Sequence, residues 1–229
     1  MFETLIGLPL FKGASMERME KTVGSSKFHF LKYLPDTVIY NAGDPCTDVT
    51  FILSGKVKFS ITNSDKRFSV SYCLDAREVL SPDFLFGRHT NFPATITAVD
   101  TVSILRIPKT DYVNILESDK VFLFNYLNIL SVNAQKAVEG IIAVSTGNVP
   151  ERIAYWISVL TQPRAYSIVL ECRRRDLSAL FGVHIVSLKN ALESMHKQGL
   201  LDYTPMSIVF HDRSALLALL HNHSEPTED

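Results

Sequence analysis

The side chains best suited to sequence-specific chemistry gather on one helical stretch near the C-terminus. Apolar residues recur there at helical spacing and predict one buried face, at Leu188, Ala191, Leu192 and Met195. The opposite face carries His184, Ile185, Val186, Ser187, Lys189, Asn190 and Glu193. This face combines an amide, two branched apolar side chains, a cation and small hydrogen-bonding groups. Groups of these kinds bind the edges of DNA bases and the phosphate oxygens. This face is therefore a candidate for reading a DNA major groove.

The outward side chains have different expected partners on DNA. Asn190 would bind adenine through two hydrogen bonds, and Ile185 and Val186 would contact thymine methyl groups. Lys189 would reach a guanine or a phosphate. Phosphate contacts are expected from His184, Ser187, Arg174 and Arg175. An A·T-rich half-site is the resulting hypothesis.

Two helices around a tight turn would hold this face in place. An apolar stripe precedes the turn, at Leu177, Leu180 and Phe181. Gly182 supplies the positive φ that ends the first helix, and the small side chain of Ser178 lets the helices approach. Gly199 ends the second helix. An ordinary packed helix pair with no DNA role is the alternative interpretation.

The flanking segments complete a predicted three-helix module with a wing. A preceding helix carries Ile153, Trp156, Ile157 and Leu160 on one face. Asn148 is a good N-cap for that helix, with Glu151 three residues later, so residues 145–148 form the expected hinge. Residues 202–210 are expected to form a hairpin, and residues 212–220 a last helix.

A long helix is predicted between residues 119 and 144, where proline is absent and apolar residues recur. Steps of three and four residues connect Leu127, Leu130, Ala134, Ala137, Ile141 and Val144. Such a narrow seam predicts pairing with the same helix of a second chain. Packing of the seam against the strand-rich region is the alternative.

The N-terminal half has the pattern of a strand-rich domain. A short helix through Val23 with Ser15 as its N-cap comes first. From residue 28 to residue 108, short runs rich in Val, Ile, Phe, Tyr and Thr alternate with turn signals. Val57, Phe59 and Ile61 alternate with polar residues, which indicates strands with one buried face. A sandwich or jelly roll is the predicted architecture.

The composition of the whole chain narrows its class. With 229 residues, 46% of them hydrophobic, the chain can form well-packed hydrophobic cores. Its net charge of −1 argues against nonspecific coating of nucleic acid.

The three cysteines, Cys46, Cys73 and Cys172, are far apart in the sequence, so buried free thiols are expected rather than disulfides or a zinc site. No signal peptide or membrane span is recognised, so a cytosolic protein is expected. No catalytic constellation appears, so an enzyme is not expected.

The chain resembles the Crp/Fnr family of bacterial transcription regulators across nearly its whole length. In that family, too, a jelly roll, a long dimer helix and a winged helix-turn-helix follow one another in this order. The motifs that carry the resemblance are residues 8–13, 40–44, 51–57, 152–154 and 176–201. The resemblance implies an α+β fold with three parts: an effector-sensing roll (1–118), a dimerisation helix and hinge (119–146) and a DNA-binding domain (147–229). It also implies a homodimer on an inverted-repeat, double-stranded DNA operator, with RNA polymerase as a further partner.

The effector site departs from the nucleotide-binding members of that family. Their Gly-Glu and Arg-Ser/Thr pairs, which hold the ribose and cyclic phosphate, correspond here to Ser81-Pro82 and Phe92-Pro93. Phenylalanine carries no charge for a phosphate, and proline has no N–H to donate. Two hydroxyls that would meet adenine correspond to Ala137 and Val138. Binding of cyclic AMP or cyclic GMP is therefore not expected.

Another small-molecule or gas effector is expected instead. Arg88 and His89 lie nearby in the sequence and could recruit a different anion, although a solvated loop pair is the simpler interpretation. Three cysteines exclude the four-cysteine iron–sulfur cluster of the family's oxygen sensors. No cofactor is predicted, and haem on His29 or His89 is the alternative.

The recognition helix also departs from the family pattern. Members usually carry Arg and Glu where this chain has Ile185 and Val186, and a second Arg where it has Asn190. The base preference must therefore differ. A family member that has lost sequence-specific DNA binding and serves as an interaction module is the competing hypothesis.

Overall fold

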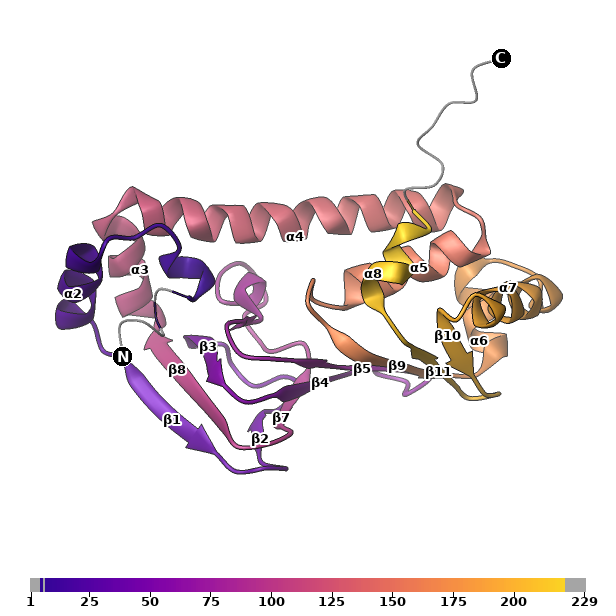
Figure 1. Cartoon of the computed structure of the whole chain (residues 1–229), viewed down its shortest axis with the longest axis horizontal. Coiled ribbons are helices and arrows are strands. Elements are labelled where there is room, and N and C mark those ends of the chain that lie inside the picture. Colours follow the sequence, from indigo (N-terminus) through magenta and orange to yellow (C-terminus); the bar gives the residue numbers. More distant parts are fainter. Residues whose placement is uncertain (1–4, 6, 221–229) are drawn as a thin grey trace, which may run out of the picture. The chain divides into compact units, whose positions relative to one another are not determined.

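The computed structural model describes residue 5 and residues 7–220, and it confirms the α+β fold (Figure 1). The chain forms two compact units. One contains the residues up to 59 together with residues 74–134, and the other contains residues 60–73 together with those from 135 onward. Among the described residues, no helix is both long and apolar enough to cross a membrane.

The first unit is the predicted roll with its flanking helices. Its elements are η1 (Pro9–Phe11), α2 (Met16–Ser25), β1 (His29–Tyr33), β2 (Val38–Tyr40), β3 (Asp48–Ser54), β6 (Val79–Leu80), η2 (Pro82–Phe84), β7 (Thr95–Ala98), β8 (Val102–Pro108) and α3 (Lys109–Ser118). Strands β1, β8, β3 and β6 form one antiparallel sheet, and β2 pairs with β7. Two further elements, β4 (Val57–Thr62) and α4 (Lys120–Thr146), begin here and continue into the second unit.

An aromatic cluster joins the sheet of the roll to the helices that cover it. Phe51 on β3 pairs in register with Leu105 on β8, and both side chains are buried. The Phe11 ring of η1 lies 6.3 Å from the Phe51 ring and 5.6 Å from that of Phe122 on α4. The N-terminal lead is therefore part of the core, where such aromatic pairs add to simple burial.

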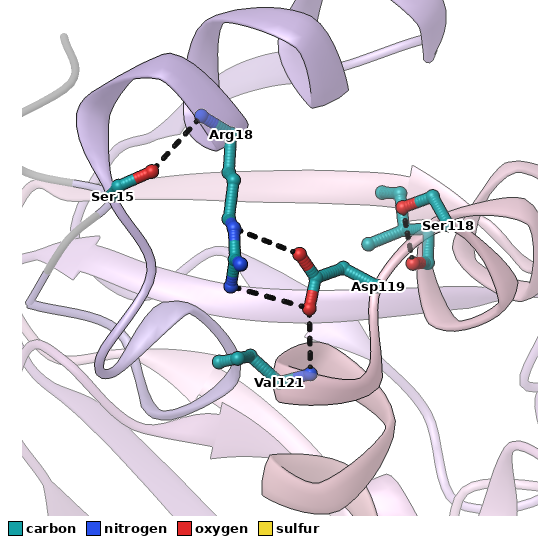
Figure 2. A network of polar contacts seen from close by, with 6 residues as sticks. Ser15, Arg18, Ser118, Asp119 and Val121 are labelled. Atoms are coloured by element: carbon teal, nitrogen blue, oxygen red, sulfur yellow. Dashed lines mark hydrogen bonds and ion pairs between the residues drawn. The ribbon is translucent and has the colours of Figure 1, made fainter.

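The start of α4 is fixed by a polar network (Figure 2). Asp119 accepts a hydrogen bond from the Val121 N–H at 2.8 Å, and its carboxylate lies 3.0 Å from Nε of Arg18 on α2. The predicted N-cap Ser15 accepts from the Arg18 N–H at 3.4 Å. Asp119 thus caps one helix while binding another. The side chains of Met16, Met19 and Val23 on α2 lie outside the described part of the structure.

The second unit contains the predicted winged helix-turn-helix. Its elements are α5 (Val149–Leu160), β9 (Tyr166–Cys172), α6 (Arg174–Phe181), α7 (Ile185–Lys197), β10 (Leu201–Tyr203), β11 (Ser207–Phe210) and α8 (Arg213–Ala218). The predicted hairpin is formed by β10 and β11, and β11 also pairs with β9. Asn148 and Glu151 make the predicted capping box, and Gly182 has a φ of 62° at the predicted turn.

Two strands of this unit were not predicted there: β9, for which no element was predicted, and β5 (Phe68–Leu74). Strand β5, which lies within the strand-rich half of the sequence, pairs antiparallel with β9 in the register Val70↔Leu170. The Trp156 ring of α5 lies 5.9 Å from that of Phe68 and 5.7 Å from that of Phe181 on α6. The β5 strand thus lies beside β9 in the sheet that contains the wing strands, and its Phe68 contacts an aromatic side chain of α5.

A buried arginine closes the same unit at its C-terminal helix. Arg213 begins α8 and donates hydrogen bonds to the Ser158 carbonyl, the Pro163 carbonyl and the Thr161 hydroxyl, at 3.0–3.3 Å. These acceptors lie at or just beyond the end of α5, where helix carbonyls lack partners within the helix. Burial lowers the pKa of Arg213 from its usual value, and the nearby phenol of Tyr72 opposes that shift.

Gly55 yields a test of how tightly the roll is built. At its φ of +84°, a Cβ atom would lie 2.5 Å from the Thr101 carbonyl oxygen, whereas Gly87 has a φ of +99° and open space around it. We expect Gly87→Ala to cost about 1–2 kcal/mol through backbone strain alone, and Gly55→Ala to cost about 1–3 kcal/mol more through the clash. Thermal unfolding of both variants measures the difference. Equal losses of stability would contradict the close approach of Gly55 to the Thr101 carbonyl.

Candidate functional site

The predicted DNA-reading face is exposed in the structure. Leu188, Leu192 and Met195 of α7 are at most 1% exposed, which fixes the side of the helix that packs inward. Of the seven residues predicted on the opposite side, Glu193 is partly exposed, and the other six are exposed: His184, Ile185, Val186, Ser187, Lys189 and Asn190. These side chains form one contiguous surface over the first two turns of α7. In a helix-turn-helix, the N-terminal part of the second helix contacts base edges.

His184 has a structural role that the sequence pattern does not reveal. It is the N-cap of α7, and its Nδ1 atom accepts a hydrogen bond from the Val186 N–H at 3.3 Å. Because Nδ1 serves as the acceptor, the proton of the neutral ring lies on Nε2 and is available for a phosphate oxygen. The cap and the predicted phosphate contact are compatible.

The three arginines before α6 have different environments. Arg173 and Arg175 are exposed, as a phosphate contact requires. The guanidinium of Arg174 instead lies 4.8 Å from the ring centre of Tyr203 on β10, and its buried Nε atom has no hydrogen-bond partner among the described residues. This cation–π contact joins α6 to the wing. A DNA contact by Arg174 stays a prediction, and its observed contact is with the protein.

The predicted effector positions in the roll include a buried aromatic stack. Phe92 is 2% exposed, and its ring lies 3.9 Å from the Tyr40 ring at an interplanar angle of 20°. The Arg106 guanidinium lies 4.7 Å from the centre of the Tyr40 ring, and the Tyr40 hydroxyl shares a 2.7 Å hydrogen bond with Thr50. Burial raises the pKa of Tyr40 to about 12. The residue aligned with the phosphate-binding arginine is thus part of the hydrophobic core.

The other predicted effector segment is tied to α4. Ser81 and Pro82 are buried, and the Tyr126 hydroxyl donates to the Pro82 carbonyl at 3.1 Å. The Asn133 amide donates to both carboxylate oxygens of Asp83, at 2.8 and 2.9 Å. Sequence reasoning missed Tyr126, Asn133 and Asp83. Nothing in their spacing indicates these contacts, because the partners are 44 and 50 residues apart.

The remaining effector candidates are exposed. Arg88, His89 and Pro93 lie at the surface of the first unit, and Ala137 and Val138 lie at the surface of the second. A pocket formed by these residues stays a prediction. Among the described residues there is no cluster of three or more His, Cys, Asp or Glu side chains suited to a metal. His29 and His89, the candidate haem ligands, are both exposed.

The seam predicted for dimerisation lies largely at the surface. Leu127 and Ile141 are 44% and 70% exposed, Ala134 and Ala137 are exposed, and Leu130 is partly exposed. The side chain of Val144 lies outside the described part of the chain.

Among the described residues, no cysteine forms a disulfide. Cys46 and Cys172 are buried as predicted, and Cys73 is only partly buried. Burial raises the pKa of the Cys46 and Cys172 thiols to about 11.

Comparison with known folds identifies similar structures at low sequence identity. The catabolite activator protein of Thermus thermophilus is 19% identical, with a TM-score of 0.54 over 93% of this chain and 98% of that one. The sensor domain of the transcriptional regulator DNR from Pseudomonas aeruginosa is 17% identical, with a TM-score of 0.51 over 60% of this chain and 90% of that one. A search of curated proteins finds no significant match. These likenesses concern the fold.

Two family models match consecutive parts of the chain. The model of the cyclic nucleotide-binding domain matches residues 30–119, which contain most of the roll. The model of the Crp-like helix-turn-helix domain matches residues 151–219, which contain α6, α7 and the wing. Because an effector-type roll and a Crp-like DNA-reading module follow one another in one polypeptide, the chain belongs to the Crp/Fnr family of DNA-binding transcription regulators.

Proposed function

We propose that the protein is a homodimeric transcription regulator whose roll responds to a signal other than cyclic AMP or cyclic GMP. The observation that carries this proposal is the exposed face of α7, which presents base-reading and phosphate-binding side chains opposite a fully buried core face. In this proposal residues 1–118 sense the signal, residues 119–146 dimerise, and residues 147–229 bind DNA. Its partners are an inverted-repeat operator, a second copy of the chain, a small-molecule or gas effector and RNA polymerase, all in the cytoplasm.

The aromatic stack in the roll supports the exclusion of cyclic nucleotides. A cyclic phosphate needs a cation and N–H donors, and Phe92 offers neither from its side chain. The Phe92 N–H is already bound to the Asp44 carbonyl at 2.9 Å. Pro82 and Pro93 have no N–H to donate. The roll therefore keeps its fold without the groups that hold the nucleotide.

We expect no useful binding of cyclic AMP or cyclic GMP to the full chain. Isothermal titration calorimetry with each nucleotide should give no saturable heat up to millimolar ligand. A dissociation constant in the micromolar range for either one would contradict this part of the proposal.

We expect two substitutions on the DNA-binding surface to have different effects. Asn190→Ala should lose about 1–3 kcal/mol of discrimination at one base pair per half-site, because a bidentate contact to a base is removed. Arg175→Ala should weaken binding to all sequences alike and reduce the slope of log affinity against log salt by about 0.9, because one phosphate contact is lost. Fluorescence anisotropy with selected and random duplexes at several salt concentrations measures both effects. If both variants bind like the wild type, the proposal gives way to the interaction-module alternative.

We expect the exposed seam of α4 to hold the dimer. Placing glutamate at both Leu127 and Ala134 should give monomers, because two carboxylates per chain would be buried without partners in a helix pair. Asn128→Glu, at another exposed position of α4, is the matched control and should stay dimeric. Light scattering distinguishes the two states. A double variant that remains dimeric would place the interface elsewhere.

A further inference from the structure

A groove in the second unit brings the tip of the β4–β5 hairpin next to the first turn of α6. The groove has a volume of about 730 Å³. It is lined by Asp65, Lys66 and Arg67 of the hairpin tip, together with residues of β5, the end of β9, the start of α6 and the turn of the wing. The groove thus lies beside α6 and the wing, the elements that flank the reading helix.

The pairing of β5 with β9 holds the hairpin tip in this place. Ser69 is in register with Glu171, and Glu171 is in register with Ser207 of β11, so three strands extend side by side to the groove. The tip itself is a closed turn, in which the Asn63 N–H donates to the Phe68 carbonyl at 3.1 Å and the Lys66 N–H to the Asn63 carbonyl at 3.0 Å. The tip is therefore an ordered extension of the winged-helix sheet.

Cations outnumber carboxylates at the groove by four to three. Four cations line it, Lys66, Arg67, Arg173 and Arg175, and all four are exposed. Three carboxylates line it as well: Asp65 is paired with Arg67 at 3.2 Å, Asp176 lies in the first turn of α6, and Glu171 is exposed on β9. Lys66 has no carboxylate within ion-pair distance among the described contacts. Its φ of 57° is a conformation that glycine or asparagine adopts more easily.

We propose that Lys66 and Arg67 bind DNA phosphates, so that a hairpin from the sensing half of the sequence extends the DNA-binding surface. The inference rests on the proposed function, since these phosphates would be the ones beside the DNA major groove that α7 enters. In helix-turn-helix complexes the first helix lies across the DNA backbone, and Arg173 and Arg175 lie at the start of that helix. Lys66 and Arg67 line the same groove as these two arginines. Their contacts are independent of base sequence.

The test removes one charge at a time without disturbing the turn. Lys66→Asn suits the positive φ, so the fold is kept while the cation is lost. We expect roughly five- to tenfold weaker binding at about 0.1 M salt to selected and random duplexes alike, and a salt slope lower by about 0.9. Lys197→Asn is the matched control, because Lys197 is an exposed lysine at the far end of α7. It should leave the slope unchanged.

A substitution of opposite sign strengthens the test. Asp65→Asn keeps an oxygen for the Arg67 N–H, which Asp65 binds at 3.1 Å, and it frees the Arg67 guanidinium from its carboxylate. Binding should become tighter and the salt slope steeper. Thermal unfolding of all three variants verifies that each is folded.

The outcomes separate this inference from the proposed function. If the wild type binds no DNA, the proposed function fails. If the wild type binds and both hairpin-tip variants match it in affinity and slope, DNA reading stands and the contact by the hairpin tip is wrong. Opposite shifts for Lys66→Asn and Asp65→Asn, with Lys197→Asn unchanged, support the inference.

Discussion

The inward packing of α7 is the constraint on which the DNA-binding surface depends. Leu188 and Leu192 have no exposed surface, and Met195 has 1%. Because a helix advances 100° per residue, three buried side chains at this spacing direct Val186 and Asn190 outward. Ser187 and Lys189 lie to the sides of the helix, and Ile185, which is 42% exposed, lies at the border of the buried face. The turn at Gly182 and the cap at His184 fix where the helix begins. The direction of the predicted DNA-reading face is thus a consequence of core packing.

The roll has the architecture of its family. At the position predicted to correspond to the phosphate-binding arginine, Phe92 stacks on Tyr40 within the hydrophobic core. The segment that would hold the ribose is bound to α4 by the Tyr126 hydroxyl and the Asn133 amide. Both contacts connect the loop of the roll to the helix we propose as the dimer interface. A signal that displaces this loop would therefore act on α4 directly.

Features that depend on neighbouring residues in the sequence could be predicted, and features that depend on contacts between distant residues could not. The helical spacing of Leu188 and Leu192, the cap at Asn148 and the glycine at position 182 are local signals, and the structure confirms each. The pairing of β5 with β9 leaves no such signal, since a strand pattern does not name its neighbour. The sequence gives no means of distinguishing Arg174 from Arg175. In the structure, Arg174 lies over the Tyr203 ring, whereas Arg175 is exposed.

Selection of DNA from a random pool by the purified protein tests the central claim most directly. Two reading helices of a dimer about 34 Å apart would enter successive major grooves. The account predicts an enriched inverted repeat whose half-sites are centred about one helical turn apart. Enrichment of an unrepeated motif would contradict the proposed dimer. Failure to enrich any sequence, with and without cell extract to supply an effector, would contradict the account as a whole.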